Sequence, residues 1–124
     1  EINAPQIKIF ADIQVKHTYP LCSEISIEQS AVWAAANYAD ALIVTGITTG
    51  AETPLETIRR VKQVTDLPIV VGSGTKKQNI CEQYRLCDGA IIGSSLKENG
   101  DLRNPVDFQR ATELIKAAKE GMTA

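Results

Sequence analysis

Four short apolar runs along the chain are each followed by turn residues and then by a helical pattern. The runs cover residues 7–15, 41–45, 68–71 and 89–92. In the later runs the apolar residues are continuous, which is typical of parallel strands covered on both faces. The first run is interleaved with polar residues. The pattern predicts four consecutive βα units with no linker or domain boundary between them.

Hydroxyl residues mark where three of the helices are expected to begin. Ser26, Thr53 and Thr75 are each followed three positions later by Glu or Gln, which fits a capping box. A fourth helix is expected to begin at Pro105, with Asn104 as its cap. Gly121 suits the end of that helix.

Two architectures suit a run of βα units, namely an open doubly wound parallel sheet and part of a (β/α)8 TIM barrel. A complete barrel needs about 250 residues, whereas the chain has 124. We therefore expect one (βα)4 half-barrel over residues 1–124, as a fragment of a barrel or as a unit that assembles into one. Its unpaired edge strands predict a homo-oligomer, or pairing with a missing N-terminal half-barrel.

Composition narrows the class of protein. The chain is 44% hydrophobic and 23% charged, which argues against disorder. Thirteen Lys and Arg are interspersed with fifteen Asp and Glu, so nothing supports a basic surface for nucleic acid. No apolar run approaches the roughly 20 residues of a membrane span, and residues 1–5 do not resemble a signal peptide. A soluble protein of the cytoplasm or an organelle matrix is expected.

The cysteines and the single histidine are a poor set of metal ligands. Cys22, Cys81 and Cys87 form no C-x-x-C pair, and His17 is the only histidine. Cys81 and Cys87 are interpreted as small buried residues in a reducing compartment. We expect neither a metal nor a cofactor.

Two similar loops follow the third and fourth predicted strands, where ligands bind in both architectures. The segments 70–74 and 91–95 each pair apolar β-branched residues with glycine and serine. Glycine lets the backbone approach a ligand closely, and unpaired N–H groups attract an anion. The loops predict a phosphate site. Its expected residues are Gly72, Ser73, Gly74, Gly93, Ser94 and Ser95.

Nucleotide-binding motifs fit these loops less well. Position 77 is Lys77, so the third glycine of G-x-G-x-x-G is missing, and no Walker-type sequence occurs. The alternative to a phosphate site is that the glycines only permit tight turns between strand and helix.

Reactive side chains gather near the end of the first predicted strand. Alternation places Asp12, Gln14 and Lys16 on one face, the interior face if the sheet closes into a barrel. Lys16 is suited to hold an anionic substrate or, if its pKa is lowered by desolvation, to form a Schiff base, and His17 to move protons. These two residues and Asp12 are the candidate catalytic residues. The alternative is an Asp12–Lys16 ion pair with His17 at the rim.

Three further residues are candidates for contact with a ligand. Thr45 and Gly46 begin a polar loop after the second strand, and Lys97 follows the second Gly-Ser loop. Asp40 and Asp88 precede their strands, at the opposite end of the sheet, where caps and turns explain them.

The motifs together resemble one family. They are Ala11 to His17, Asp40 to Gly46, Val71 to Gly74, Asp88 to Lys97 and Asn104 to Asp107. In this order they are similar to the C-terminal half of the BtpA family, which is named for a photosystem I biogenesis protein and includes SgcQ-like proteins. The resemblance implies a (β/α)8 barrel whose first four βα units are absent here.

The resemblance gives two expectations for function. Barrels of related fold with Gly-Ser loops at these positions bind sugar phosphates, nucleotides or similar molecules, so we expect a phosphorylated small-molecule ligand, with no reaction assigned. The alternative is a non-catalytic factor for the assembly or stability of a membrane complex such as photosystem I. That role implies peripheral association with a membrane.

Overall fold

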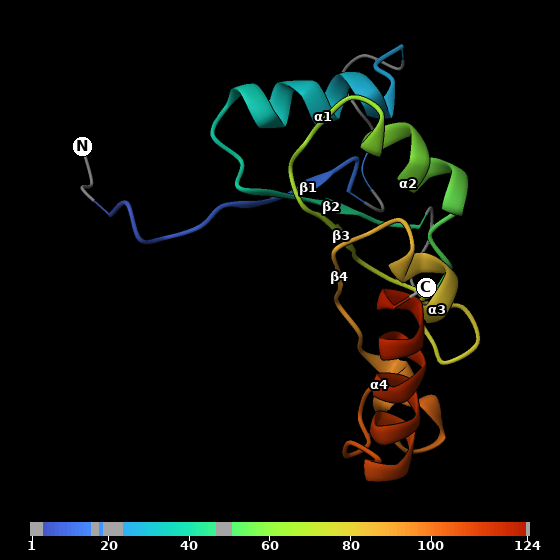
Figure 1. The fold of residues 1–124 in the computed structure, drawn as a ribbon. Coiled ribbons are helices and arrows are strands. Elements are labelled where there is room, and N and C mark those ends of the chain that lie inside the picture. Colours follow the sequence, from blue (N-terminus) through green and yellow to red (C-terminus); the bar gives the residue numbers. More distant parts are fainter. Residues whose placement is uncertain (1–3, 16–17, 19–23, 47–50, 124) are drawn as a thin grey trace.

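The computed structural model of the chain describes residues 4–15, 18, 24–46 and 51–123. The first six elements are β1 (Phe10–Ile13), α1 (Ile27–Ala36), β2 (Ala41–Val44), α2 (Leu55–Lys62), β3 (Ile69–Val71) and α3 (Ile80–Tyr84). They are followed by β4 (Gly89–Ala90), the short 3-10 helices η1 (Ser94–Leu96) and η2 (Glu98–Gly100), and α4 (Phe108–Met122). The strands are shorter than the predicted runs, but their order and spacing confirm the four βα units (Figure 1).

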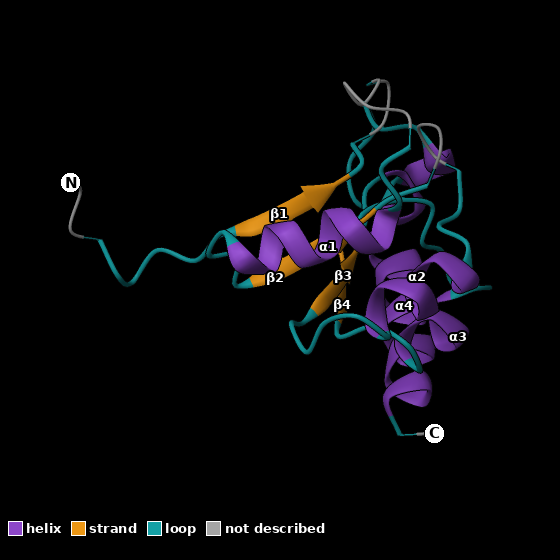
Figure 2. Cartoon of the chain, turned by 90° about the horizontal axis from the view of Figure 1, so that it is seen from above, coloured by secondary structure: helices purple, strands orange, loops and turns teal. Residues whose placement is uncertain are grey.

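The four strands form one parallel sheet in the order β1-β2-β3-β4. Phe10 pairs with Ala41, Leu42 with Ile69 and Val70 with Gly89. The helices lie on one side of this sheet (Figure 2). A doubly wound sheet needs a reversal of strand order and helices on both faces. Neither feature is present in the described part of the chain, which forms a parallel α/β sheet with consecutive strands side by side.

The main core lies between the sheet and its helices. Leu42 and Val44 of β2, with Ile69 and Val71 of β3, are at most 1% exposed. Because their neighbours in sequence point the other way, these residues form one continuous apolar surface. α1 and α2 cover it with Ile27, Ala31, Ile58 and Val61. Each fully buried aliphatic side chain stabilises the fold by roughly 1.5–3 kcal/mol.

A second cluster joins α3 to α4. It contains Ile80, Leu114 and Ala118. Gly121 lies inside α4 rather than at its end, and a Cβ atom there would sit 2.5 Å from the carbonyl oxygen of Cys81. Glycine at this position therefore allows the two helices to approach closely, which is a different role from the predicted helix end.

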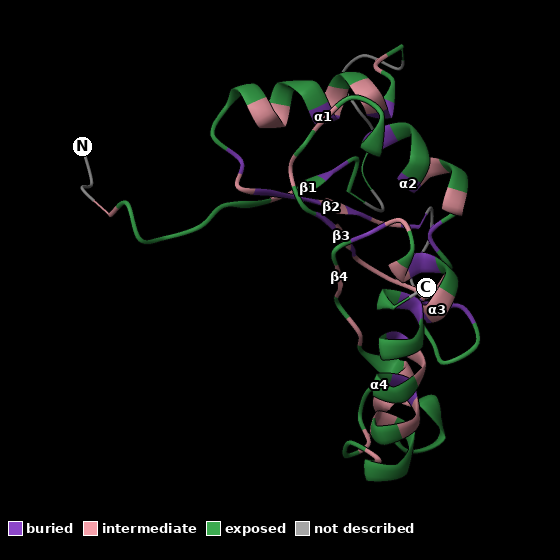
Figure 3. Ribbon diagram, viewed as in Figure 1, coloured by how far each residue is buried: buried purple, intermediate pink, exposed green. Residues whose placement is uncertain are grey.

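The other face of the sheet carries no helix. Phe10 is 55% exposed and Ile91 51%, whereas Ile43 and Val70 are half-buried. Figure 3 shows the contrast between buried strands and the exposed outer sides of α1 and α4. We call this side of the sheet the open face.

One of the predicted helix caps is confirmed. The Ser26 hydroxyl accepts from the N–H of Gln29 at 3.2 Å and begins α1. The predicted caps Thr53 and Thr75 are wrong, because both side chains are buried and bind other partners, the carbonyl of Ser73 for Thr53 and the side chain of Gln83 in α3 for Thr75. The fourth helix begins at Phe108 rather than at Pro105. Its cap is Asp107, whose carboxylate accepts from the N–H groups of Gln109 and Arg110.

Candidate functional site

The loops that follow β2 and β3 pack tightly against each other at the carboxyl ends of the strands. Gly74 has φ +70°, and a Cβ atom added there would lie 2.3 Å from the carbonyl oxygen of Ala51. A Cβ on Gly46 would lie 2.4 Å from the same oxygen. A Cβ on Gly72 would meet the Thr45 methyl group at 2.4 Å. Close backbone approach therefore requires glycine at positions 46 and 74, whereas at Gly72 side-chain methyl groups occupy the space.

Hydroxyl groups hold these two loops together. Thr53 is fully buried, and its hydroxyl lies 3.5 Å from the carbonyl oxygen of Val44 and 3.3 Å from that of Ser73. The Ser73 hydroxyl donates to the Ala51 carbonyl at 3.1 Å. The Ser73 hydroxyl thus binds the neighbouring loop. The backbone N–H of Ser73 is the group that can bind a ligand.

A hydrogen bond joins the two Gly-Ser loops, after β3 and β4. The Ser95 hydroxyl donates to the Thr75 carbonyl at 2.6 Å. The Thr75 hydroxyl in turn donates to the side-chain oxygen of Gln83, which is fully buried. The sequence did not identify Thr75 and Gln83 as parts of the site. Gln78 follows Thr75 by three positions, so the segment fits a capping box equally well.

Both loops leave backbone donors open. Within the described residues, the N–H groups of 73–75 and of 93–95 donate to no protein acceptor. Gly93 and Ser94 are exposed, and Gly93 lies where η1 begins. Six amide donors in two joined loops can bind an anion, and glycine keeps the surrounding surface free of side chains.

Asp12 lies on the open face of β1, at its carboxyl half. Its predicted neighbours Lys16 and His17 lie outside the described residues. Gln14 does not share this face, contrary to prediction. It has φ +55°, and its side-chain amide donates to the Ile25 carbonyl at 3.1 Å, on the side of α1. The left-handed residue ends the alternation that placed it beside Asp12.

The remaining candidate ligand residues border the loops. The Thr45 hydroxyl is buried and has no hydrogen-bond partner in the described structure. Gly46 is buried beneath the loop after β2. Lys97 is half-buried and follows η1, where its N–H donates to the Ser94 carbonyl at 3.0 Å. Thr45 thus has a buried polar atom without a partner in the described structure, and Lys97 lies one residue after η1.

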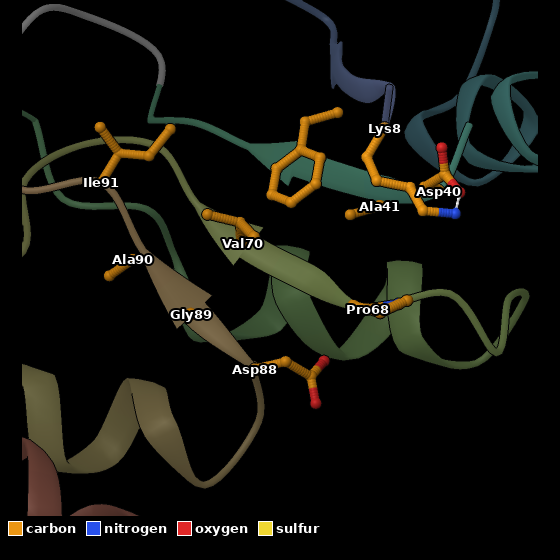
Figure 4. Close-up of a pocket in the computed structure, with 10 residues that line it drawn as sticks. Lys8, Asp40, Ala41, Pro68, Val70, Asp88, Gly89, Ala90 and Ile91 are labelled. Carbon is orange, nitrogen blue, oxygen red and sulfur yellow. Dashed lines mark hydrogen bonds and ion pairs between the residues drawn. The ribbon is translucent and has the colours of Figure 1, made fainter. Parts of the chain in front are cut away.

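A hollow of about 630 Å³ lies on the open face at the opposite, amino ends of the strands (Figure 4). Phe10, Val70 and Ile91 supply apolar wall. The Lys8 ammonium lies 2.8 Å from the Asp40 carboxylate at its rim. This bond, and a second one from the N–H of Ile9, hold the pKa of Asp40 below its usual value.

Asp88, on the same rim, accepts from the N–H of Ile69 at 2.9 Å. The carboxylates of Asp40 and Asp88 are therefore engaged with the backbone of the preceding strand. These bonds favour the structural interpretation of both residues over a catalytic one. The hollow thus lies at the opposite end of the strands from the Gly-Ser loops.

The described residues contain neither a candidate metal site nor a candidate thiol site. No group of three His, Cys, Asp or Glu side chains gathers there in a way that suits a metal ion. Cys87 is buried as predicted, and burial raises the pKa of its thiol, whereas Cys81 is only half-buried. Cys22 lies outside the described residues. Within the described part of the chain, no helix is long and apolar enough to cross a bilayer.

Comparison with curated proteins shows relatives in distant organisms. An uncharacterized protein of Methanocaldococcus jannaschii is 36% identical over 116 residues, which cover 93% of this chain and 43% of that protein. An uncharacterized, mitochondrial protein of Caenorhabditis elegans is 35% identical over 93% of this chain and 42% of its own length. The photosystem I biogenesis protein BtpA of Synechocystis is 30% identical over 94% of this chain and 41% of its own length.

The chain thus spans less than half the length of these relatives. No solved structure matches it. The model of the BtpA family matches residues 1–120, nearly the whole of the chain. Together with the ordered βα units and the two joined Gly-Ser loops, this match shows that the chain belongs to the BtpA family.

Proposed function

We propose that the chain binds a phosphorylated small molecule, of the sugar phosphate or nucleotide type, at the joined loops after β3 and β4. One observation carries the proposal, namely that Ser95 and Thr75 bind these loops to each other while the N–H groups of 73–75 and 93–95 find no acceptor in the described structure. A phosphate group carries enough acceptor oxygens to satisfy several such donors. In (β/α)8 barrels a phosphate is frequently held by the loops after the last two strands.

Each candidate residue then has a separate task. Gly93 allows the backbone to approach the phosphate, Gly72 and Gly74 let the loops after β2 and β3 pack together, and residues 73–75 with 93–95 donate to the phosphate. Thr45, with Gly46 beside it, supplies the unused hydroxyl at the next loop. Lys97 adds positive charge at the rim.

The rest of the ligand extends over the open face toward the end of β1. We assign acid–base or electrostatic work there to Asp12, Lys16 and His17.

Isothermal titration calorimetry with a panel of sugar phosphates and nucleotides tests binding. Each ligand is paired with its unphosphorylated form, which is expected to bind at least ten times more weakly. The variant Gly93→Val adds a branched side chain next to the open N–H groups of 93–95, with its Cβ 3.3 Å from Leu102, and is expected to abolish binding. Gly89→Val is the matched control, since a Cβ at Gly89 meets only the Val70 methyl group, at an ordinary 3.6 Å, and Gly89 begins β4 at the end of the sheet away from the loops. Equal affinity for phosphorylated and unphosphorylated ligands would contradict the proposal.

A second candidate function is suggested by one named relative. The Synechocystis protein is described as a photosystem I biogenesis protein, which favours a factor that assembles or stabilises a membrane complex from a peripheral position. The mitochondrial label of the Caenorhabditis elegans relative fits an organelle matrix as the place of action. This function predicts that a defined protein partner still binds after both Gly-Ser loops are disrupted. Loss of partner and phosphate binding in the same loop variants would instead favour the first proposal.

A further inference from the structure

Three consecutive backbone carbonyls in the loop after β3 are each bound by a side-chain donor. The donors come from three separate parts of the chain, namely the loop after β2, the residue before α3, and η1. The three pairs are the Ser73 carbonyl with the Thr53 hydroxyl at 3.3 Å, the Gly74 carbonyl with the Asn79 amide at 3.0 Å, and the Thr75 carbonyl with the Ser95 hydroxyl at 2.6 Å. The loop is therefore fixed through its acceptors.

These bonds also determine where N–H groups of the loop point. In a planar trans peptide the carbonyl and the N–H point in opposite directions. The Ser73 carbonyl shares its peptide with the N–H of Gly74, and the Gly74 carbonyl shares its peptide with the N–H of Thr75. Within the described residues, neither N–H donates to a protein acceptor. Two consecutive open donors with fixed directions are suited to bind an anion.

Asn79 holds two adjacent peptides of this loop at once. Its side-chain amide donates to the Gly74 carbonyl, and its side-chain oxygen accepts from the N–H of Lys76 at 2.8 Å. Asn79 is 6% exposed, so water competes little for either bond. Gly74 has φ +70° and no Cβ atom to restrict its backbone. Asn79 therefore restrains a position that glycine would otherwise leave free to rotate.

Gln83 of α3 holds the side chain of Thr75. Its side-chain oxygen accepts from the Thr75 hydroxyl at 2.9 Å, and both residues are buried. The other polar atom of the Gln83 amide, Nε2, is buried and has no hydrogen-bond partner in the described structure. An unpaired buried donor lowers the stability of a fold, and native proteins contain few of them. An apolar side chain of similar size, such as methionine, would fill the same space without this cost. The stability of the fold alone thus does not account for an amide at this position.

We propose that Asn79 and Gln83 are positioning residues of the phosphate site. Their carboxamides hold the N–H groups of 73–75 in the directions that a phosphate needs before the ligand arrives, which reduces the conformational entropy lost on binding. Neither carboxamide binds the ligand itself. Gln83 is fully buried, and both polar groups of Asn79 are used by the loop.

The inference rests on the proposed function and adds to it a division of tasks. Backbone N–H groups contact the phosphate, while the amide side chains behind them determine their directions. Hydrogen-bond partners that stand behind metal ligands have a comparable role, and their removal weakens metal affinity about 10- to 100-fold. We expect effects at the lower end of this range here.

The double variant Thr75→Val with Gln83→Met tests the role of Gln83. It replaces both hydrogen-bonding partners by apolar groups of similar shape and removes the unpaired Nε2, so the urea midpoint is expected to equal or exceed that of the wild type. Affinity for inorganic phosphate, measured from the backbone amide shifts of the loop, is expected to fall roughly tenfold. A purely structural amide would give lower stability with unchanged affinity, and that result would overturn the proposal.

Asn79→Ala tests the second carboxamide. The variant frees the Gly74 carbonyl and the Lys76 N–H, and we expect affinity for inorganic phosphate to fall roughly tenfold or more. Asn37→Ala is the matched control, because the Asn37 amide also donates to a backbone carbonyl, that of Trp33 at 2.8 Å, but at the end of α1. It should leave phosphate affinity unchanged, and circular dichroism checks that both variants remain folded. Equal affinity in Asn79→Ala and the wild type would contradict the role of Asn79.

Failure of this inference can be distinguished from failure of the proposed function. If inorganic phosphate shifts no amides of residues 73–75 in the wild type, the proposed function is wrong and this inference falls with it. If the wild type binds phosphate and the variants at positions 75, 79 and 83 bind it equally well, only this inference is wrong.

Discussion

The two ends of the sheet use the same kinds of groups in opposite ways. At the amino ends, the carboxylates of Asp40 and Asp88 accept from the backbone N–H groups of Ile9 and Ile69, so side chains satisfy the strands. At the carboxyl ends, the hydroxyls of Ser73 and Ser95 donate to backbone carbonyls and leave nearby N–H groups open. At the amino ends, these hydrogen bonds satisfy the backbone donors of Ile9 and Ile69 within the chain. The arrangement at the carboxyl ends fixes the loops but leaves donors for a ligand, which is how a rigid binding site is built.

The largest effect is expected from Gly74→Ala at the carboxyl ends. The substitution combines a positive φ with backbone atoms closer than 3.0 Å to the new Cβ, so we expect a loss of about 3 kcal/mol or more in the free energy of unfolding. Gly100→Ala is the control, since Gly100 has φ +73° and open space. It should cost only about 1 kcal/mol. Equal losses in urea unfolding would show that the loops do not pack as described.

The next effect concerns the amino ends. Asp88→Ala removes the acceptor of the Ile69 N–H and is expected to cost about 1–2 kcal/mol, with ligand affinity unchanged. Asp66→Ala is the control. Asp66 also precedes a strand, but it is exposed and makes no hydrogen bond within the described residues. If Asp88→Ala lowered ligand affinity more than stability, the functional division between the two ends would be wrong.

A smaller effect on stability, with a larger one on binding, is expected from Ser95→Ala. It removes the hydroxyl that joins the two Gly-Ser loops, which costs about 1 kcal/mol of stability. The looser loops should bind a phosphorylated ligand roughly tenfold more weakly. Thr112→Ala is the control, because the Thr112 hydroxyl donates within α4 to the Phe108 carbonyl, away from the loops. Unchanged affinity in Ser95→Ala would remove the support for a joined site.

The smallest effect on the free energy of unfolding is expected when the pH is lowered. It arises between α1 and α2 and not at either end of the sheet. Arg60 of α2 donates two hydrogen bonds to Glu28 of α1 and lowers the pKa of that carboxylate from 4.5 to about 2. A lowered pKa stabilises the fold above pH 4.5, and the contribution is lost as the pH falls from 4.5 toward 2. In Glu28→Gln this part of the pH dependence of unfolding should disappear. If the free energy of unfolding fell equally with pH in the wild type and the variant between pH 4.5 and 2, the ion pair would contribute nothing to stability.

Much of the fold could be predicted from the sequence, because apolar runs and turn residues act locally. The continuous run 41–44 became the buried strand β2, and Ser26 became a true cap. The errors concern residues whose partners are distant in sequence. Thr53 and Thr75 resemble caps, but the carbonyl of Ser73 and the amide of Gln83 bind their hydroxyls instead.

The site could be predicted in part for the same reason. The similarity between the two loops is visible in the sequence, but the hydrogen bond from Ser95 to the Thr75 carbonyl that joins them is not. Gln14 was placed on the wrong face because alternation assumes an extended backbone, and its positive φ ends that pattern. The packing of Gly46 and Gly74 against Ala51 depends on how two loops fit together, which no local pattern states.

Backbone amide chemical shifts measured during titration with a sugar phosphate test the central claim most directly. The account predicts that shifts concentrate on the amides of residues 73–75 and 93–95. The amides of Ile9 and Ile69, whose acceptors are Asp40 and Asp88, should stay unchanged. Shifts concentrated at the amino ends of the strands, or no shifts in either loop at millimolar ligand, would contradict it.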